Sequence, residues 1–146
     1  MLHTIRLGAK SLFQQDPEGI VLVNRGPNQF ALIYECKARP KGYAMTADDV
    51  LRYKKYIETK RHEISENHNL LLTHFLIVSS SFKGDFGKKI DEIGSDGIVV
   101  SLMPASELTY FSNMLQELEF PKLRLVELRR GFCHGLVSKQ KLVSCV

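Results

Sequence analysis

The stretch QFALIYECK, from Gln29 to Lys37, decides how the rest of this sequence folds. Its β-branched and aromatic residues predict a strand. Apolar residues fall on both faces, as in a strand that is covered on each side. Glu35 and Lys37 interrupt that pattern at the end of the strand and share one face, because strand side chains alternate with a period of two. Two charges in such a place are costly unless they are paired or bind a metal.

The segment before this strand predicts its hairpin partner. Residues 19–24 (GIVLVN) read as a strand, and residues 25–28 (RGPN) read as the turn between the two strands. A turn centred in that segment places Glu18 directly opposite Glu35. Opposed residues have Cβ atoms about 4.5–5.5 Å apart. Two carboxylates at that spacing repel one another unless a divalent cation lies between them.

Glu18 and Glu35 therefore predict a metal site of hard oxygen ligands, which Mg²⁺ prefers. The backbone carbonyl of Cys36 is the expected third ligand. Asp16 falls opposite Lys37 and is the alternative first ligand if the turn register differs. Lys37 would orient the attacking water and stabilise charge on phosphoryl oxygens, so these parts predict phosphodiester hydrolysis. The competing interpretation is a surface Glu35–Lys37 ion pair contributing about 0–1 kcal/mol.

The rest of the chain predicts alternating helices and strands. Thr46 can cap a helix that runs to about His62, with Asp49 three residues after the cap. Further elements are predicted as strands within residues 70–79 and 97–103, a short helix around 86–93, and helices over 105–118 and 123–132. This order predicts an α/β fold with a mixed central sheet flanked by helices, in one domain. Residues 135–146 give no clear pattern and are expected to form a loose tail.

Composition excludes several classes of protein. The chain of 146 residues is 44% hydrophobic and 25% charged, and no apolar stretch approaches the ~20 residues of a membrane span. With no signal peptide pattern, an intracellular protein is expected. Three cysteines without paired spacing argue against a disulfide framework or a four-ligand zinc site. The net charge of +4 permits a polyanionic partner, although basic pairs such as Lys60-Arg61 usually lie on solvated faces.

At these residues the chain resembles the PD-(D/E)xK nuclease superfamily, and within it the cleavage domain of FokI-type (type IIS) restriction endonucleases. Residues 17–19 (PEG) stand where that family has Pro-Asp-Gly, and residues 35–37 (ECK) stand where it has an acid-x-Lys triplet. Shorter matches follow in order: Lys37-Ala38 with Gly42-Tyr43, Ala47-Asp48-Asp49 with Arg52-Tyr53, FLIVSSSFKG (75–84) and LRLVELRRGF (123–132). The resemblance implies a restriction-endonuclease-like core.

The resemblance also implies an activity. It implies a prokaryotic, cytoplasmic endonuclease that uses Glu18, Glu35 and Lys37 to cut double-stranded DNA with Mg²⁺, or with Mn²⁺ as a substitute. It further implies a homodimer formed through Asp48 and Arg52. The competing interpretation of these two residues is an ordinary pair within one helix, contributing about 0.2–0.5 kcal/mol.

Lys83 is expected near the scissile phosphate, and the lysines at positions 54, 55, 88 and 89 are candidate DNA-backbone contacts or merely solubilising charges. The sequence departs from the family where Glu18 replaces aspartate, which lengthens the ligand arm by one methylene. It also lacks a DNA-recognition domain, so recognition is expected from another domain or subunit. Two alternatives stay open: a catalytically inactive nuclease-like module for DNA binding or dimerisation, and a repair or junction nuclease of the same superfamily.

Overall fold

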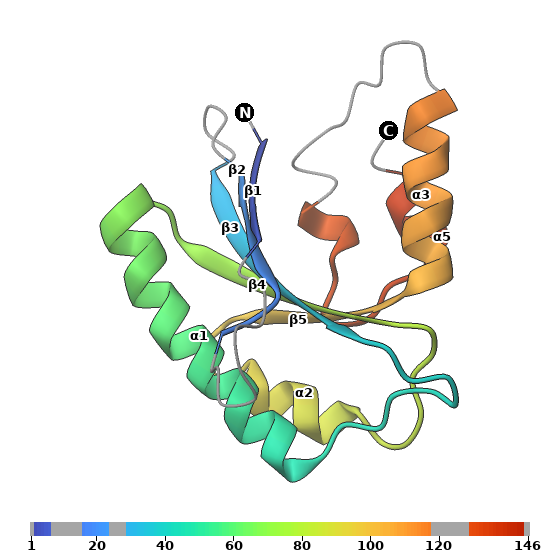
Figure 1. Ribbon diagram of the computed structural model, residues 1–146, viewed down its shortest axis with the longest axis horizontal. Helices are drawn as coiled ribbons and strands as arrows, with labels where there is room; N and C mark the ends of the chain where they lie inside the picture. Colours follow the sequence, from blue (N-terminus) through green and yellow to red (C-terminus); the bar gives the residue numbers. More distant parts are fainter. Residues whose placement is uncertain (1, 7–15, 24–28, 118–128, 145–146) are drawn as a thin grey trace.

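The structure, a computed structural model, describes residues 2–6, 16–23, 29–117 and 129–144 (Figure 1). Its elements in chain order are β1 (Leu2–Arg6), β2 (Gly19–Val23), β3 (Phe30–Lys37), α1 (Ala47–His68), β4 (Leu72–Ser79), α2 (Gly87–Ile93), β5 (Val99–Pro104), α3 (Ala105–Glu117), β6 (Gly135–Leu136) and α5 (Lys139–Val143). The elements predicted between residues 19 and 118 are confirmed, with their ends shifted by up to six residues. Most of the helix predicted over 123–132 lies outside the described residues.

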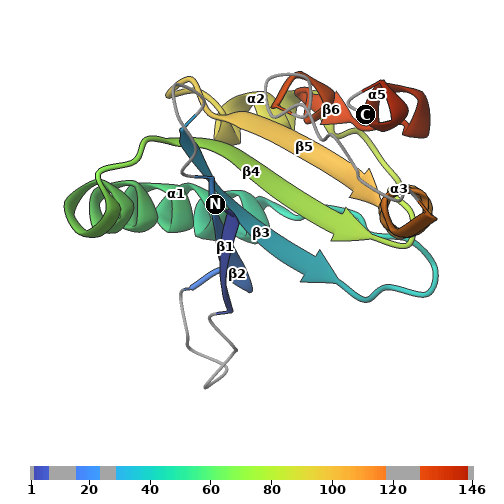
Figure 2. The same cartoon turned by 90° about the horizontal axis from the view of Figure 1, so that it is seen from above.

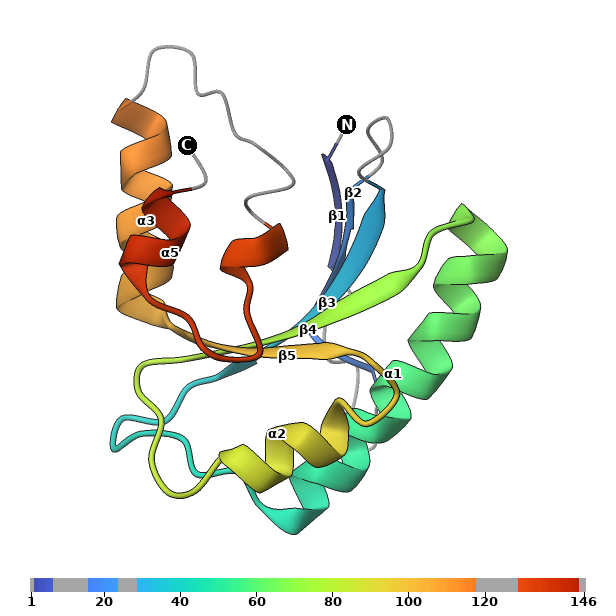
Figure 3. The ribbon, with the colours of Figure 1, turned by 180° about the vertical axis from the view of Figure 1, so that it is seen from behind.

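The described strands form one mixed sheet in the order β1-β2-β3-β4-β5-β6. The first three strands are antiparallel neighbours, and β3 to β6 run parallel. Figure 2 shows β3, β4 and β5 side by side from above. Helices α1 and α2 cover one face of the sheet, and α3 and α5 cover the other (Figures 1 and 3). The predicted α/β fold with a mixed central sheet flanked by helices is therefore confirmed.

The two helical layers explain why β3 is apolar on both faces. Ala31 and Ile33 belong to the core cluster that packs against α1 and α2. Leu32, between them, belongs to a second cluster that includes Phe111 of α3 and Leu142 of α5. Residues 30–33 of the strand are therefore buried against one layer or the other, as in parallel sheets with helices on both sides.

Helix α1 begins at the predicted cap. The Thr46 hydroxyl accepts a hydrogen bond from the Asp49 amide at 3.1 Å, and the Asp49 carboxylate accepts one from the Thr46 amide at 3.1 Å. This reciprocal capping box satisfies two donors that a helix start leaves unpaired. The helix continues past His62 because Ile64 extends its buried stripe, and it ends at Asn69, whose φ of 52° is left-handed.

The C-terminal segment corrects one prediction. Residues 135–146 were expected to form a loose tail, but β6 pairs with β5 and α5 packs on the sheet. Val137 and Leu142 are fully buried in the second cluster, so the prediction is wrong for residues 135–143. Strand β1 is a second difference, because the sequence indicated no strand over residues 2–6, which pair with β2.

His74 makes the stability of this fold depend on pH. It is 4% exposed in β4, with its ring centroid 5.5 Å from that of Phe30 and 6.5 Å from that of Phe132. Burial lowers its pKa from 6.5 to about 4. Between those values the unfolded chain binds a proton that the folded chain does not. The free energy of unfolding should therefore fall as the pH drops from about 6.5 to about 4, by up to about 3 kcal/mol.

Urea unfolding of the parent and of His74→Gln at pH 4.5 and 7 measures this effect. The variant, which has no titrating ring, should lose less stability at low pH than the parent. An equal loss in both proteins would assign the pH dependence to other groups.

Candidate active site

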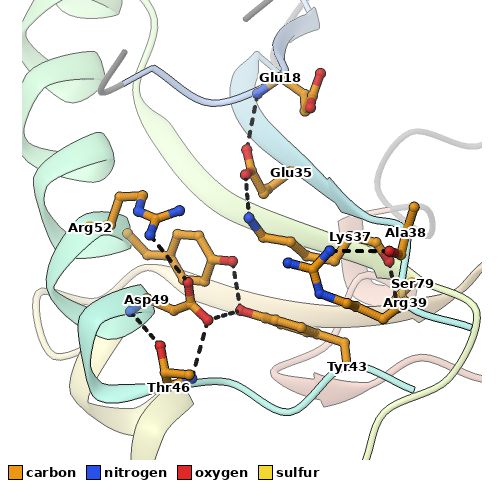
Figure 4. A network of polar contacts seen from close by, with 11 residues as sticks. Glu18, Glu35, Lys37, Ala38, Arg39, Tyr43, Thr46, Asp49, Arg52 and Ser79 are labelled. Atoms are coloured by element: carbon orange, nitrogen blue, oxygen red, sulfur yellow. Dashed lines mark hydrogen bonds and ion pairs between the residues drawn. The ribbon is translucent and has the colours of Figure 1, made fainter. Parts of the chain in front are cut away.

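The hairpin register brings the two acidic motifs together. Gly19 pairs with Tyr34 and Val23 pairs with Phe30, which is the predicted alignment of β2 and β3. One residue before this ladder, the backbone amide of Glu18 donates a hydrogen bond to Oε2 of Glu35 at 3.2 Å (Figure 4). The predicted neighbourhood of Glu18 and Glu35 is confirmed, and the contact between them runs from a backbone amide to a carboxylate.

Glu35 and Lys37 form a close ion pair on one face of β3. Lys37 Nζ lies 2.8 Å from Glu35 Oε1, and the side chains are only 12% and 9% exposed. The ion pair of the competing interpretation is therefore present, but it is largely buried and not at the surface. A charge pair taken out of water has to be well hydrogen-bonded to be tolerated. Here both carboxylate oxygens of Glu35 accept a hydrogen bond, one from Lys37 and one from the Glu18 amide.

Gly19 is required by the side chain opposite it. A Cβ at this position would lie 2.4 Å from the hydroxyl oxygen of Tyr34, its direct partner across the ladder. The tyrosine ring thus occupies the space that a side chain on β2 would need. A buried proline, Pro17, lies just before Glu18. Pro17 has a fixed φ and Gly19 is held in the ladder with β3, so the backbone is constrained on both sides of the Glu18 amide.

Asp16 lies in a different place from the predicted one. Its Oδ1 atom is 2.9 Å from Nζ of Lys60 in α1, so the expected position opposite Lys37 is wrong. The ladder between β2 and β3 begins only at Gly19. Because the proline at position 17 has no amide hydrogen to donate, the chain leaves the ladder before it reaches Asp16.

A buried tyrosine pair lies beneath Lys37. The Nζ atom of Lys37 is 5.7 Å from the centre of the Tyr53 ring. The hydroxyl groups of Tyr53 and Tyr43 are 2.7 Å apart, and the Tyr43 hydroxyl donates to Oδ2 of Asp49 at 2.8 Å (Figure 4). Burial raises the pKa of both tyrosines. Both hydroxyls therefore remain protonated. The tyrosine pair links Asp49, at the start of α1, to the ring that lies beneath Lys37.

Asp49 stays ionised at the end of this network. Burial alone would raise its pKa, but hydrogen bonds from the Tyr43 hydroxyl and the Thr46 amide, together with the charge of Lys37, lower it. The sequence predicted Asp49 as part of the cap and placed Tyr53 in the helix that follows it. It did not indicate that either lies near the site, because that placement depends on how the helix packs on the sheet.

Two loops meet at the end of β3 and β4, beside Lys37. The amide of Tyr43 donates to the Ser81 carbonyl at 2.9 Å, and the amide of Lys83 donates to the Tyr43 carbonyl at 3.0 Å. The Ser79 hydroxyl donates to the Lys37 carbonyl at 2.8 Å. Exposed basic side chains lie on these loops, namely Arg39, Lys41 and Lys83. The paired loops thus place Lys83, a predicted DNA contact, beside Gly42 and Tyr43 in the segment that follows β3.

The other predicted DNA contacts lie on helices. Lys54 Nζ is 3.8 Å from Oε1 of Glu92 in α2, and Lys55 is exposed on α1. Lys88 is exposed on α2, whereas Lys89 donates to the Met45 carbonyl at 2.6 Å. None of these contacts places the four lysines at the Glu35–Lys37 pair.

The predicted dimer residues are both exposed near the start of α1. Arg52 Nη2 lies 3.7 Å from Oδ1 of Asp49, an i,i+3 contact. The ion pair described for Arg52 is therefore with Asp49, and not with Asp48 as the intrahelical interpretation expected. Both Asp48 and Arg52 remain on the solvent-facing side of the helix, away from the sheet.

Glu18 and Glu35 are the carboxylates that could hold a hard cation at this place. Among the residues described, no three or more Asp, Glu, His or Cys side chains converge to form a metal cage. A divalent ion at this place would use the carboxylates of Glu18 and Glu35, the predicted Cys36 carbonyl, water and substrate oxygens. Mg²⁺ is commonly bound in this way, through one or two carboxylates with waters and phosphate oxygens completing its shell.

None of the described helices combines the length and the apolar character that crossing a membrane requires.

Comparison with solved structures confirms the fold. The chain is similar to a structure of restriction endonuclease FokI, with a TM-score of 0.75 and 18% identity, and to a structure of that enzyme bound to DNA, with a TM-score of 0.74 and 21% identity. Each match covers 94% of this chain but 25% of the other, so the chain spans a quarter of the length of these relatives. No curated protein matches it. The model of the FokI cleavage domain matches residues 2–131, and the chain therefore belongs to the FokI cleavage domain family.

Proposed function

We propose that this chain is the cleavage domain of a type IIS-like restriction endonuclease, which hydrolyses phosphodiester bonds of double-stranded DNA with Mg²⁺. The observation that carries the proposal is the nearly buried Glu35–Lys37 pair, with the Glu18 amide on the second oxygen of Glu35. Membership of the FokI cleavage domain family supports it, as does the likeness to a FokI structure that was solved with DNA.

Each residue of the site has a distinct role in this proposal. Glu18 and Glu35 would hold Mg²⁺, or Mn²⁺ in its place, with the Cys36 carbonyl as third ligand. The bound ion would supply a nucleophilic water at neutral pH and polarise the phosphoryl group. Lys37 would donate to a phosphoryl oxygen or to the attacking water, and its ammonium, 2.8 Å from Glu35, supports this role. The contacts that fix these groups before substrate binds reduce the cost of reaching the transition state.

Plasmid cleavage tests the proposal. The purified chain should nick or cut supercoiled DNA with Mg²⁺ or Mn²⁺, and EDTA should stop the reaction. Glu18→Gln should reduce the rate at least about tenfold, because a neutral amide is a poorer ligand than a carboxylate. Tight DNA binding without cleavage under any metal condition would contradict the proposal and favour the inactive module instead.

Backbone contacts by Lys83 would anchor DNA at the site. Without metal, the logarithm of the binding constant should fall linearly with the logarithm of salt concentration, and Lys83→Ala should reduce that slope by about 0.9. Lys139→Ala removes an equal charge from α5, outside the proposed DNA surface, and serves as the control. If both variants keep the parental slope, Lys83 is a solubilising charge.

Double-strand cleavage would require two copies of the chain, related through α1. Asp48 and Arg52 are exposed there, and Leu51 between them is 64% exposed. Asp48→Arg would bring like charges together, which costs several kcal/mol at an interface, so double-strand breaks should fall at least about tenfold while nicking persists. Glu58→Arg makes the same change of charge further along the helix and is the matched control. Unchanged self-association and unchanged double-strand cutting would rule out this interface.

Recognition of a particular DNA sequence is proposed to come from another domain or subunit. The relatives of known structure are about four times as long as the matched part. This difference in length supports the proposal that cleavage and recognition belong to separate domains.

A further inference from the structure

Lys60 is a buried lysine on the inner face of α1. The residue is 4% exposed, and its Nζ atom lies 2.9 Å from Oδ1 of Asp16 and 2.8 Å from Oε2 of Glu63. Burial alone would lower the pKa of Lys60, but the contacts with Glu63 and Asp16 outweigh burial and raise it. A charged ammonium therefore lies under the sheet and needs these carboxylates as partners.

Asp16 connects this lysine to the first acidic motif. Asp16 lies two positions before Glu18, so their Cα atoms lie within about 7 Å of one another. Pro17 is buried between them and has a fixed φ. On the far side, Glu18 donates its amide to Glu35. The backbone of Glu18 is thus held from two directions, by Glu35 in β3 and, through Asp16, by Lys60 in α1.

The same face of α1 contacts the second motif. Tyr53 lies two turns before Lys60 on the helix, and the ring of Tyr53 lies beneath the ammonium of Lys37. Residues seven positions apart share one face of a helix. One rigid helix therefore contacts both halves of the site, with Tyr53 at the motif of β3 and Lys60 at the motif that precedes β2.

We propose that Lys60 is a positioning residue for Glu18, and that Asp16 is the counter-ion of Lys60 and not a metal ligand. The inference rests on the proposed metal-dependent cleavage. Without the Lys60–Asp16 ion pair, the segment ahead of Glu18 loses its anchor on α1. An uncompensated carboxylate is also left near Glu18 and Glu35.

Lys60→Met tests the role, because methionine keeps much of the apolar stem and removes the ammonium. The concentration of Mn²⁺ that gives half-maximal plasmid cleavage should rise about 10- to 100-fold, as it does for groups that orient metal ligands in other proteins. The rate at saturating metal should change much less. Lys60→Arg should restore the parental midpoint.

Two further variants keep the test independent of folding. Asp16→Asn removes the same ion pair from its more exposed side and should shift the metal midpoint as Lys60→Met does. Glu63→Gln removes the other partner of Lys60 but keeps the contact with Asp16, so its midpoint should stay near the parental value. Circular dichroism and thermal unfolding identify any variant whose loss is structural.

The outcomes separate this inference from the proposed function. A parent that neither binds Mn²⁺ in calorimetry nor cleaves DNA overturns both. A parent that does both, with an unchanged cleavage midpoint and an unchanged calorimetric Mn²⁺ affinity in Lys60→Met and Asp16→Asn, overturns the inference alone. So does a maximal rate that falls in Asp16→Asn as far as in Glu18→Gln, because Asp16 would then act as a ligand.

Discussion

Lys37→Ala should lower the rate of Mg²⁺-dependent plasmid cleavage at least about 100-fold. The reason is that Lys37 supplies the positive charge nearest to the proposed reacting phosphate, and removal of one preorganised donor from an active site typically costs 10²–10³ in rate. Its ammonium lies 2.8 Å from Glu35 and 5.7 Å from the centre of the Tyr53 ring, so the group is held in place before DNA binds. Single-turnover cleavage of a supercoiled plasmid measures the effect.

Removal of Lys37 also leaves the Glu35 carboxylate, which is only 7% exposed, without its positively charged partner. The unpaired charge destabilises the fold. Lys37→Met, which keeps most of the stem, is therefore assayed beside the alanine variant, and urea unfolding shows how much folded protein each assay contains. Lys139→Ala is the charge control. Cleavage at the parental rate by folded Lys37→Met would place the reacting centre elsewhere in the chain.

Tyr53→Ala should lower the free energy of unfolding by about 3–5 kcal/mol. The ring is fully buried and packs edge-on against Phe75, with ring centres 5.0 Å apart. Its hydroxyl also lies 2.7 Å from that of Tyr43. Tyr53→Phe, which keeps the ring but leaves the Tyr43 hydroxyl with one partner fewer, should lower the free energy of unfolding by about 1–3 kcal/mol. Chemical denaturation of the three proteins gives these differences directly.

The two variants separate the effect of the Tyr53 ring from the effect of its hydroxyl. Tyr53→Phe keeps a ring beneath Lys37, so its cleavage rate should stay close to that of the parent, whereas Tyr53→Ala removes that support. Leu71→Ala, at a residue that is 65% exposed, should change stability by no more than about 0.5 kcal/mol. If Tyr53→Ala is as mild as this control, the packing described for α1 against β3 and β4 is incorrect.

The centre of the fold was predictable from sequence because its signals are local. The apolar run that ends in Glu35-Cys36-Lys37, together with the turn before it, was enough to give the register of β2 and β3. Hairpin register follows from turn position and from which residues must be buried. The cap at Thr46 was equally local, since its two hydrogen bonds span only three residues.

The support of the site was not predictable, because it depends on contacts between distant segments. Lys60 stands in the sequence as half of a basic pair, which usually means a solvated face, and only the packing of α1 on the sheet places it against Asp16. The prediction missed the short C-terminal elements for a related reason. Five or fewer residues are too few for a periodic pattern, so Leu142 is assigned to the core only by the tertiary structure.

The C-terminal elements have a consequence for anyone who wishes to fuse this domain to a DNA-binding module. Strand β6 covers the outer edge of β5, and α5 covers part of the apolar face that includes Phe111. A shortened version that stops before Gly135 would expose the unpaired edge of β5 and the apolar surface that α5 covers. Such edges are templates for association between chains. A linker attached after residue 144 keeps both β6 and α5 in place. The useful boundary for protein engineering therefore lies there and not at the end of the family match at residue 131.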